Sequence, residues 1–110
     1  MSFDIIPTPN FQREAKVLQK KYPSFKADLA LLGKALAENP QQGVEVYKNC
    51  FKIRFSIKSK GKGKSGGGRL ITCVRIVRGK IYLLSVFDKS EKENVIDTFL
   101  RELLKNLDEI

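Results

Sequence analysis

The segment Phe51–Val77, FKIRFSIKSKGKGKSGGGRLITCVRIV, contains two strand-like runs separated by a glycine-rich stretch. Apolar and polar side chains strictly alternate over Phe51–Lys58, which predicts a half-buried strand with a basic outer face. The run Arg69–Val77 is rich in β-branched and apolar residues and predicts a second strand. The stretch between them, Lys58–Leu70, holds five glycines and five cationic side chains, with no acid. We therefore expect a hairpin whose tip is disordered in the free protein.

Hydrophobic spacing on either side of this hairpin predicts one α+β domain covering residues 1–110. Thr8 and Ser24 are placed to cap two antiparallel helices, and Ser90 and Glu93 form a capping box for a closing helix. The apolar face expected for that closing helix runs from Val95 and Ile96 to Leu107. In chain order the expected elements are a strand at 3–6, helices at 9–22 and 25–38, strands at 51–58, 69–77 and 80–87, and a helix after 90. The order β-α-α-β-β-β-α predicts a single antiparallel sheet packed against helices.

Positive charge is concentrated in one third of the chain. The formal net charge is +9, and the segment 44–80 contains eleven of the 21 Lys and Arg residues but one of the 12 acids. The remaining residues are close to neutral. Such a concentration favours a polyanion as the partner over a merely solubilising surface, which usually mixes both signs.

If Lys58 lies opposite Arg69 across the loop, the alternation places several cations on one face of the sheet. Lys52 then faces Arg75, and a tight turn at Arg78–Gly79 brings Tyr82 beside Arg75. A register shift of two residues changes these partners but not their face. The side chains expected to share this surface are Lys52, Arg54, Lys58, Arg69, Arg75 and Tyr82.

The glycine-rich stretch does not match the phosphate-binding motifs that it superficially resembles. Residues 61–66 fit G-x-G-x-x-G, and Gly63-Lys64-Ser65 ends like a P-loop, but both motifs require a helix to follow. Here a strand follows. Its amides and its lysines, Lys60, Lys62 and Lys64, are suited instead to a phosphate chain without fixed geometry. We expect these three lysines to contribute to binding and little to stability.

Other chemistry is sparse in this sequence. The chain has no histidine, and its two cysteines, Cys50 and Cys73, have no metal-ligand spacing and are expected in the core. We therefore predict no metal and no cofactor. No run of 18 apolar residues occurs and no secretory signal is expected, so we predict a cytoplasmic protein that does not span a membrane.

The sequence resembles RelE/ParE-superfamily toxins of type II toxin–antitoxin modules over nearly its whole length. The stretch Cys50–Phe55 resembles the central strand of that family. Residues Lys60–Ile71, KGKGKSGGGRLI, resemble the K-G-K-x-G-G-x-R-[IVL]-I segment of the HigB-like branch, and Tyr82–Glu91 resembles the last strand and its turn. The resemblance implies a ribosome-dependent endoribonuclease that cuts messenger RNA in the A site of the 30S subunit. Its implied partners are a cognate antitoxin, the messenger RNA and the ribosome.

The resemblance also implies site residues. Lys52, Arg54 and Arg69 match family positions that orient the scissile phosphate and stabilise its charge. Lys52 is the candidate for a general base, with phosphate contact alone as the alternative. The RNA-binding candidates are Lys58, Lys60, Lys62, Lys64, Arg75, Tyr82, Lys89 and Lys92.

Two departures from the family pattern keep other functions open. Several RelE members have arginine after the last strand, where this chain has Ser90, and the tyrosine or histidine near the C-terminal helix of some members has no counterpart. The alternatives are a ParE-like inhibitor of DNA gyrase and a toxin-fold binding protein without catalysis. The basic face favours RNA over gyrase, and a plain RNA-binding module is disfavoured because Tyr82 is the one stacking aromatic expected there.

Overall fold

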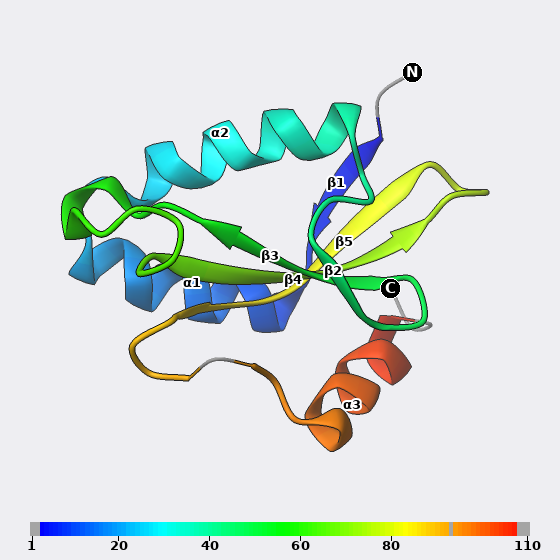
Figure 1. Ribbon diagram of the computed structural model, residues 1–110. Coiled ribbons are helices and arrows are strands. Elements are labelled where there is room, and N and C mark those ends of the chain that lie inside the picture. Colours follow the sequence, from blue (N-terminus) through cyan, green and yellow to red (C-terminus); the bar gives the residue numbers. More distant parts are fainter. Residues whose placement is uncertain (1–2, 93, 108–110) are drawn as a thin grey trace.

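The computed structural model describes residues 3–92 and 94–107. It contains a five-stranded sheet in the order β1-β5-β4-β3-β2, with helices on both sides (Figure 1). In chain order the elements are β1 (Asp4–Pro7), α1 (Pro9–Lys21), α2 (Phe25–Glu38), β2 (Val44–Tyr47), β3 (Cys50–Phe55), the 3-10 helix η1 (Lys58–Lys60), β4 (Gly68–Arg75), β5 (Lys80–Asp88) and α3 (Asp97–Leu107). The predicted α+β class is confirmed. The sheet is mixed, because β1 runs parallel to β5, and the short strand β2 was not predicted.

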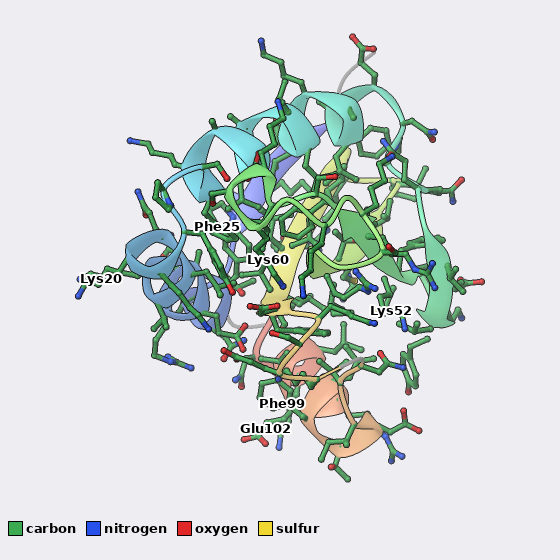
Figure 2. The ribbon with its side chains drawn as sticks, turned by 60° about the vertical axis from the view of Figure 1, so that its left-hand side comes forward. Lys20, Phe25, Lys52, Lys60, Phe99 and Glu102 are labelled. Atoms are coloured by element: carbon green, nitrogen blue, oxygen red, sulfur yellow. The ribbon has the colours of Figure 1, made fainter. Side chains whose placement is uncertain are left out.

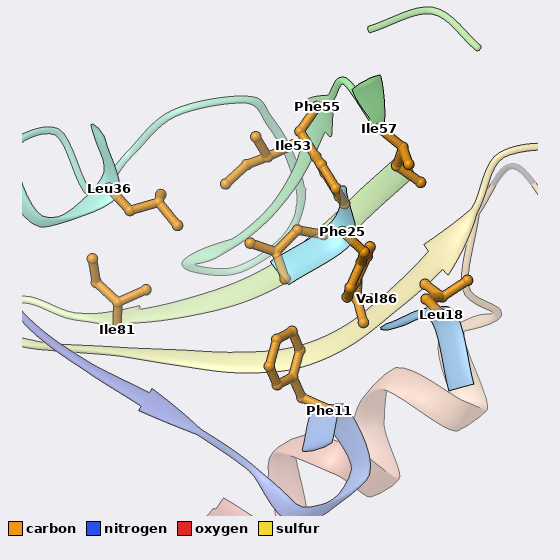
Figure 3. Packing of buried hydrophobic residues seen from close by; sticks show 10 residues of the cluster. Phe11, Leu18, Phe25, Leu36, Ile53, Phe55, Ile57, Ile81 and Val86 are labelled. Carbon is orange, nitrogen blue, oxygen red and sulfur yellow. The ribbon is translucent and has the colours of Figure 1, made fainter. Parts of the chain in front are cut away.

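The helices α1 and α2 cover one face of the sheet. Figure 3 shows apolar side chains of both helices, such as Phe11 and Phe25, packed against Ile53 and Val86 of the strands. Thr8 caps α1 as predicted: its hydroxyl accepts from the amide of Phe11 and also donates to a backbone carbonyl of β5. The start of α1 is thereby fixed to the sheet. Ser24 makes no capping bond to α2: its hydroxyl oxygen accepts from the Ser59 amide, and the hydroxyl donates to the carboxylate of Asp28.

The opposite face of the sheet is covered by α3. Leu100, Leu103 and Leu107 pack against strand residues that include Ile71 and Leu84. This helix begins at Asp97, several residues later than predicted. Consequently the predicted apolar face is wrong at its start: Val95 is buried ahead of the helix, and the side chain of Ile96 is exposed.

The predicted capping box of Ser90 and Glu93 is not observed at Ser90. The amide and hydroxyl of Ser90 both donate to the carboxylate of Asp88, at 3.0 and 2.9 Å. Glu93 lies outside the described residues. The segment after β5 is therefore held to the end of that strand, and α3 starts only after it.

The register of the central hairpin differs from the expected one by four residues. Arg54 lies opposite Arg69, and Lys52 lies opposite Ile71. The strands also end earlier than predicted, β3 at Phe55 and β4 at Arg75, while β4 begins at Gly68. Gly68 is required there because a Cβ atom would lie 2.5 Å from the Phe55 ring. A shift of an even number of residues preserves the faces, so Lys52 and Arg54 still share one.

Among the described residues, no helix combines the length and the apolar character needed to cross a membrane.

Candidate nucleic-acid interface

The glycine-rich loop between β3 and β4 is folded. It begins with η1 and continues through turns, with Gly61 and Gly63 in the left-handed region at φ 71° and 62°. Ile57 at its base is fully buried against the helices. The expectation of a disordered tip is therefore wrong. The error arose because the loop has few apolar residues of its own and is held by polar contacts instead.

Arg69 holds the loop from the inside. One terminal nitrogen of its guanidinium donates to the carbonyl oxygens of Lys64 and Gly68, at 3.0 and 2.9 Å. The other donates to the carbonyl of Ser65 at 3.1 Å. The residue is 1% exposed. Sequence reasoning placed this side chain on an open outer face opposite Lys58, but the loop folds back over it, so its fork is occupied by the protein's own backbone.

Lys60 anchors the loop from its start. Its ammonium nitrogen lies 2.6 Å from the Asp88 carboxylate, and the two side chains are 9% and 0% exposed. The same carboxylate accepts hydrogen bonds from the Tyr22 hydroxyl and from Ser90. Figure 2 shows Lys60 in the middle of the molecule, whereas Lys20 projects outward from α1. Lys60 was predicted as an RNA ligand, but its charge is already paired in the interior.

The Asp88 carboxyl is held in its ionised form. Burial alone would raise its pKa, but the hydrogen bonds from Lys60, Tyr22 and Ser90 outweigh this effect and keep the pKa well below its ordinary value. The pKa of the Tyr22 hydroxyl is raised, chiefly by its hydrogen bond to Asp88. An ionised acceptor of this kind supports the loop and does not act as a proton donor at neutral pH.

A second polar contact ties η1 to the first turn of α2. The Asp28 carboxylate accepts from the Lys58 amide at 3.0 Å, and the Ser24 hydroxyl accepts from the Ser59 amide at 2.8 Å. Asp28 is 5% exposed. The loop is thus fixed to α2, to β5 and to β4 through separate anchors.

The remaining cations at this end of the sheet face solvent. We name them the loop-end basic surface: Lys52, Arg54, Lys58, Lys62, Lys64 and Lys89. Lys52 is half-buried and lies on the flank of the sheet in Figure 2, and the other five are exposed. The two acids packed beside this surface, Asp28 and Asp88, are buried and hydrogen-bonded. The surface therefore presents excess positive charge, which attracts a polyanion.

Of the three other predicted ligands, Arg75 and Tyr82 lie elsewhere, whereas Lys92 is exposed at the loop end and its amide donates to the Asp88 carbonyl. Arg75 is opposite Lys80, about 20 Å along β4 from Arg69. Tyr82 is opposite Cys73 and 5% exposed in the cluster covered by α3, so it offers no open ring for a base. The Lys92 ammonium lies 4.9 Å from the centre of the Phe87 ring, a cation–π contact.

Sequence reasoning missed Asp88 and Tyr22. The available signal for Asp88 was a lone acid at the end of an apolar strand. No pattern connects it with Tyr22, 66 residues away in the chain.

The expectation for the cysteines is confirmed: Cys50 and Cys73 lie opposite each other and are buried, and the pKa of Cys50 is raised by its hydrogen bond to Cys73 and by burial. Among residues 3–92 and 94–107, no group of three side chains is arranged to hold a metal ion.

No protein-family model matches the chain. Two solved structures of the E. coli toxin RelE resemble it closely in fold. A variant of that toxin with two arginines replaced by alanine, in the free state, superposes with a TM-score of 0.62 at 16% identity, covering 96% of this chain and 98% of the other. The isolated toxin gives a TM-score of 0.60 at 14% identity, covering 94% and 98%. The chain therefore has a RelE-like fold.

Proposed function

We propose that the protein is the toxin of a type II toxin–antitoxin module and that it inhibits translation by cutting messenger RNA on the ribosome. The observation that carries this proposal is the loop-end basic surface on a RelE-like fold, where the acids packed beneath the loop, Asp28 and Asp88, are buried and hydrogen-bonded. Its cations stand on a rigid strand and on an anchored loop. The surface can therefore hold a phosphate chain without first ordering itself.

The chemistry requires no nucleophile from the protein. In this reaction the 2′-hydroxyl of the RNA loses its proton and attacks the neighbouring phosphorus, and the bond from phosphorus to the 5′ oxygen breaks. The leaving 5′ oxygen takes up a proton, so the products are a 2′,3′-cyclic phosphate and a 5′-hydroxyl. Negative charge grows on the non-bridging oxygens in the transition state, where nearby cations stabilise it.

Lys52 and Arg54 are the side chains that we assign to this stabilisation. Both project from the same face of β3, and neither is buried. Arg69 acts through the loop: by holding the carbonyls of Lys64 and Ser65 it positions the loop cations beside Arg54. We therefore propose Arg69 as a positioning residue, in place of the catalytic role expected from the sequence.

The partners follow from the same proposal. They are a cognate antitoxin, messenger RNA and the A site of the 30S subunit, in the cytoplasm. The KGKGKSGGGRLI segment favours the HigB-like branch. Ribosome dependence is proposed because the ribosome can align the 2′-hydroxyl with the phosphate, and alignment alone is able to supply several kcal/mol of the barrier.

One observation favours a second candidate, a toxin-fold binding protein without catalysis. The chain has no histidine, and of its three tyrosines one is bonded to a carboxylate and one is buried. Tyr22 is bonded to Asp88, Tyr82 is buried, and Tyr47 is on β2. Under this candidate the basic surface binds RNA or the ribosome and blocks translation without cutting.

Inducible expression separates these functions. The toxin proposal requires growth arrest with early loss of methionine incorporation and new 5′ ends in messenger RNA by primer extension. Loss of methionine incorporation without new 5′ ends identifies the binding protein. Selective loss of thymidine incorporation with intact translation contradicts both and points to the gyrase inhibitor expected for a ParE-like protein. Expression of a Lys52→Ala, Arg54→Ala double variant is the matched control.

A further inference from the structure

A hollow of about 260 Å³ lies between α2 and the outer edge of β3. β2 pairs with β3 only from Cys50 to Lys52, and Gly43 lies against Ile53, so Arg54 and Phe55 have no ladder partner on this edge. The walls come from three segments that are far apart in the chain: α2, β3 and the glycine-rich loop. We call this feature the edge hollow, and its lining residues used below are Leu31, Leu32, Arg54, Phe55, Lys58 and Lys64.

One side of the edge hollow is cationic. Arg54, Lys58 and Lys64 line it and are exposed. The acid in its lining, Asp28, is buried and accepts from the Ser24 hydroxyl at 2.6 Å and the Lys58 amide at 3.0 Å. With three cations and one carboxyl group, the lining still carries an excess of positive charge, which attracts an anion. Three positive charges around one small space match a phosphate group.

The other side of the edge hollow is apolar. Leu31 is 55% exposed on the outer surface of α2, and Leu32 and Phe55 lie beside it in the lining. An exposed leucine adjoining three cations combines an apolar surface with a phosphate-binding one. A nucleotide has the same two parts, a flat base and a charged phosphate.

We infer that the edge hollow binds one nucleotide of a single-stranded RNA, with the phosphate at Arg54, Lys58 and Lys64 and the base against Leu31. The inference rests on the proposed function and extends it: the strand passes Lys52 and Arg54 and continues over the edge of β3. The volume is below the roughly 300–1,000 Å³ of sites that enclose a whole small ligand, so it suits one unit of a longer chain.

An acidic peptide is the competing occupant, and the geometry favours RNA over it. A peptide that adds to a sheet edge needs several open residues, whereas β3 leaves two residues, Arg54 and Phe55, without a partner on this edge. A single base and phosphate need no longer groove. The edge hollow is also continuous, through Arg54, with the surface assigned to the reacting phosphate.

The experiment uses the full chain and a short fluorescein-labelled single-stranded RNA, with anisotropy measured over a range of KCl concentrations. Leu31→Glu places a carboxylate in the edge hollow, and Val17→Glu is its control, since Val17 is 64% exposed on α1. Lys58→Ala with Lys64→Ala removes two cations, and Lys16→Ala with Lys20→Ala removes two exposed ones from α1. Circular dichroism verifies that each variant is folded.

We expect Leu31→Glu to weaken RNA binding about tenfold, in the range of a lost base contact. The Lys58/Lys64 pair should make the slope of log K against log salt shallower by about 0.7, the value for one phosphate of a single strand. Both control variants should bind like the parent. A photo-crosslink from 4-thiouridine RNA to the peptide containing Leu31 would support the same placement.

Two results overturn the inference while leaving the proposed function intact. In the first, the parent binds and cuts RNA, and Leu31→Glu and the Lys58/Lys64 pair match their controls. In the second, these variants keep RNA binding but lose an acidic peptide of the antitoxin, which makes the edge hollow a peptide site. Failure of the parent to bind RNA at low salt contradicts the RNA interface itself, and the edge hollow with it.

Discussion

Arg54 and Arg69 lie directly opposite each other in the β3–β4 ladder, yet one guanidinium is exposed and the other is 1% exposed. Like charges in opposed positions of a sheet are destabilising. The conflict is relieved because Arg69 donates to three carbonyl groups of the loop. The pair thus separates two tasks, since Arg69 holds the loop while Arg54 remains open to a phosphate.

We predict that Arg69→Ala destabilises the fold by about 2–4 kcal/mol, because it removes the charged hydrogen bonds to the carbonyls of Lys64, Ser65 and Gly68 and leaves a cavity in place of a buried side chain. Arg54→Ala should change the free energy of unfolding by less than about 0.5 kcal/mol, as an exposed side chain does. Arg69→Lys should recover part of the loss, since it restores the charge but not the fork. Urea denaturation measures all three. Equal stability of the two alanine variants would contradict the structural role of Arg69.

The lysines of the glycine-rich loop should differ sharply in their effect on stability. Lys60→Met breaks the ion pair with buried Asp88 and should cost about 2–4 kcal/mol, less than a fully uncompensated charge because Tyr22 and Ser90 still bond the carboxylate. Lys62→Met, in an exposed position of the same loop, is the matched control and should be nearly neutral. Thermal unfolding of the two variants is the measurement. A melting temperature for Lys60→Met that equals the Lys62→Met value would show that the ion pair contributes nothing.

The lowered pKa of Asp88 also predicts how the stability of the fold responds to acid. Its pKa in the folded protein lies below the ordinary 3.8, so ionised Asp88 stabilises the fold fully above that pH, and the contribution is lost as the pH falls further. Asp88→Asn should therefore be destabilised at pH 7, and its deficit relative to the parent should shrink between about pH 5 and pH 2. Denaturation curves across this range test the prediction. A deficit that is constant with pH would assign the effect to packing instead of charge.

The faces of the hairpin could be predicted from the sequence because alternation depends only on neighbouring residues. Lys52 and Arg54 share a face because they are two residues apart on one strand, and a register error of four residues, an even number, does not change which β4 residues belong to that face. The register itself was not predictable. The register depends on where β3 ends and where β4 begins. These ends are set by Ile57, which packs in the core beneath the helices, and by Gly68, which packs against Phe55.

The sequence was equally unable to show which segments cover each face of the sheet. Arg69 and Tyr82 were both placed on the expected face, but the loop buries the first and the cluster under α3 includes the second. Asp88 was missed for a related reason. Its partners Lys60 and Tyr22 are 28 and 66 residues away, and no local spacing connects them. Tertiary contacts of this kind decide which cations remain exposed to solvent.

The final prediction concerns cleavage and compares cations along the same sheet. Arg54→Ala should lower the single-turnover rate on programmed ribosomes by roughly 30- to 1,000-fold, because a transition-state contact of this kind is worth about 2–4 kcal/mol. The rate reduction for Lys52→Ala should fall in the same range if Lys52 stabilises the phosphate. Arg75→Ala is the matched control, since it removes an arginine at the opposite end of β4, too far away to touch the same phosphate.

Arg54→Lys refines this comparison, because it keeps the charge but loses the planar fork and should recover only part of the rate. The variants must first be shown to be as stable as the parent. Circular dichroism with urea denaturation establishes that each variant is as folded as the parent. Parent-like cleavage by folded Arg54→Ala would remove Arg54 from the site. A loss for Arg75→Ala as large as that for Arg54→Ala would show that the rate follows total charge, so that the reacting phosphate is not held at the loop end of β3.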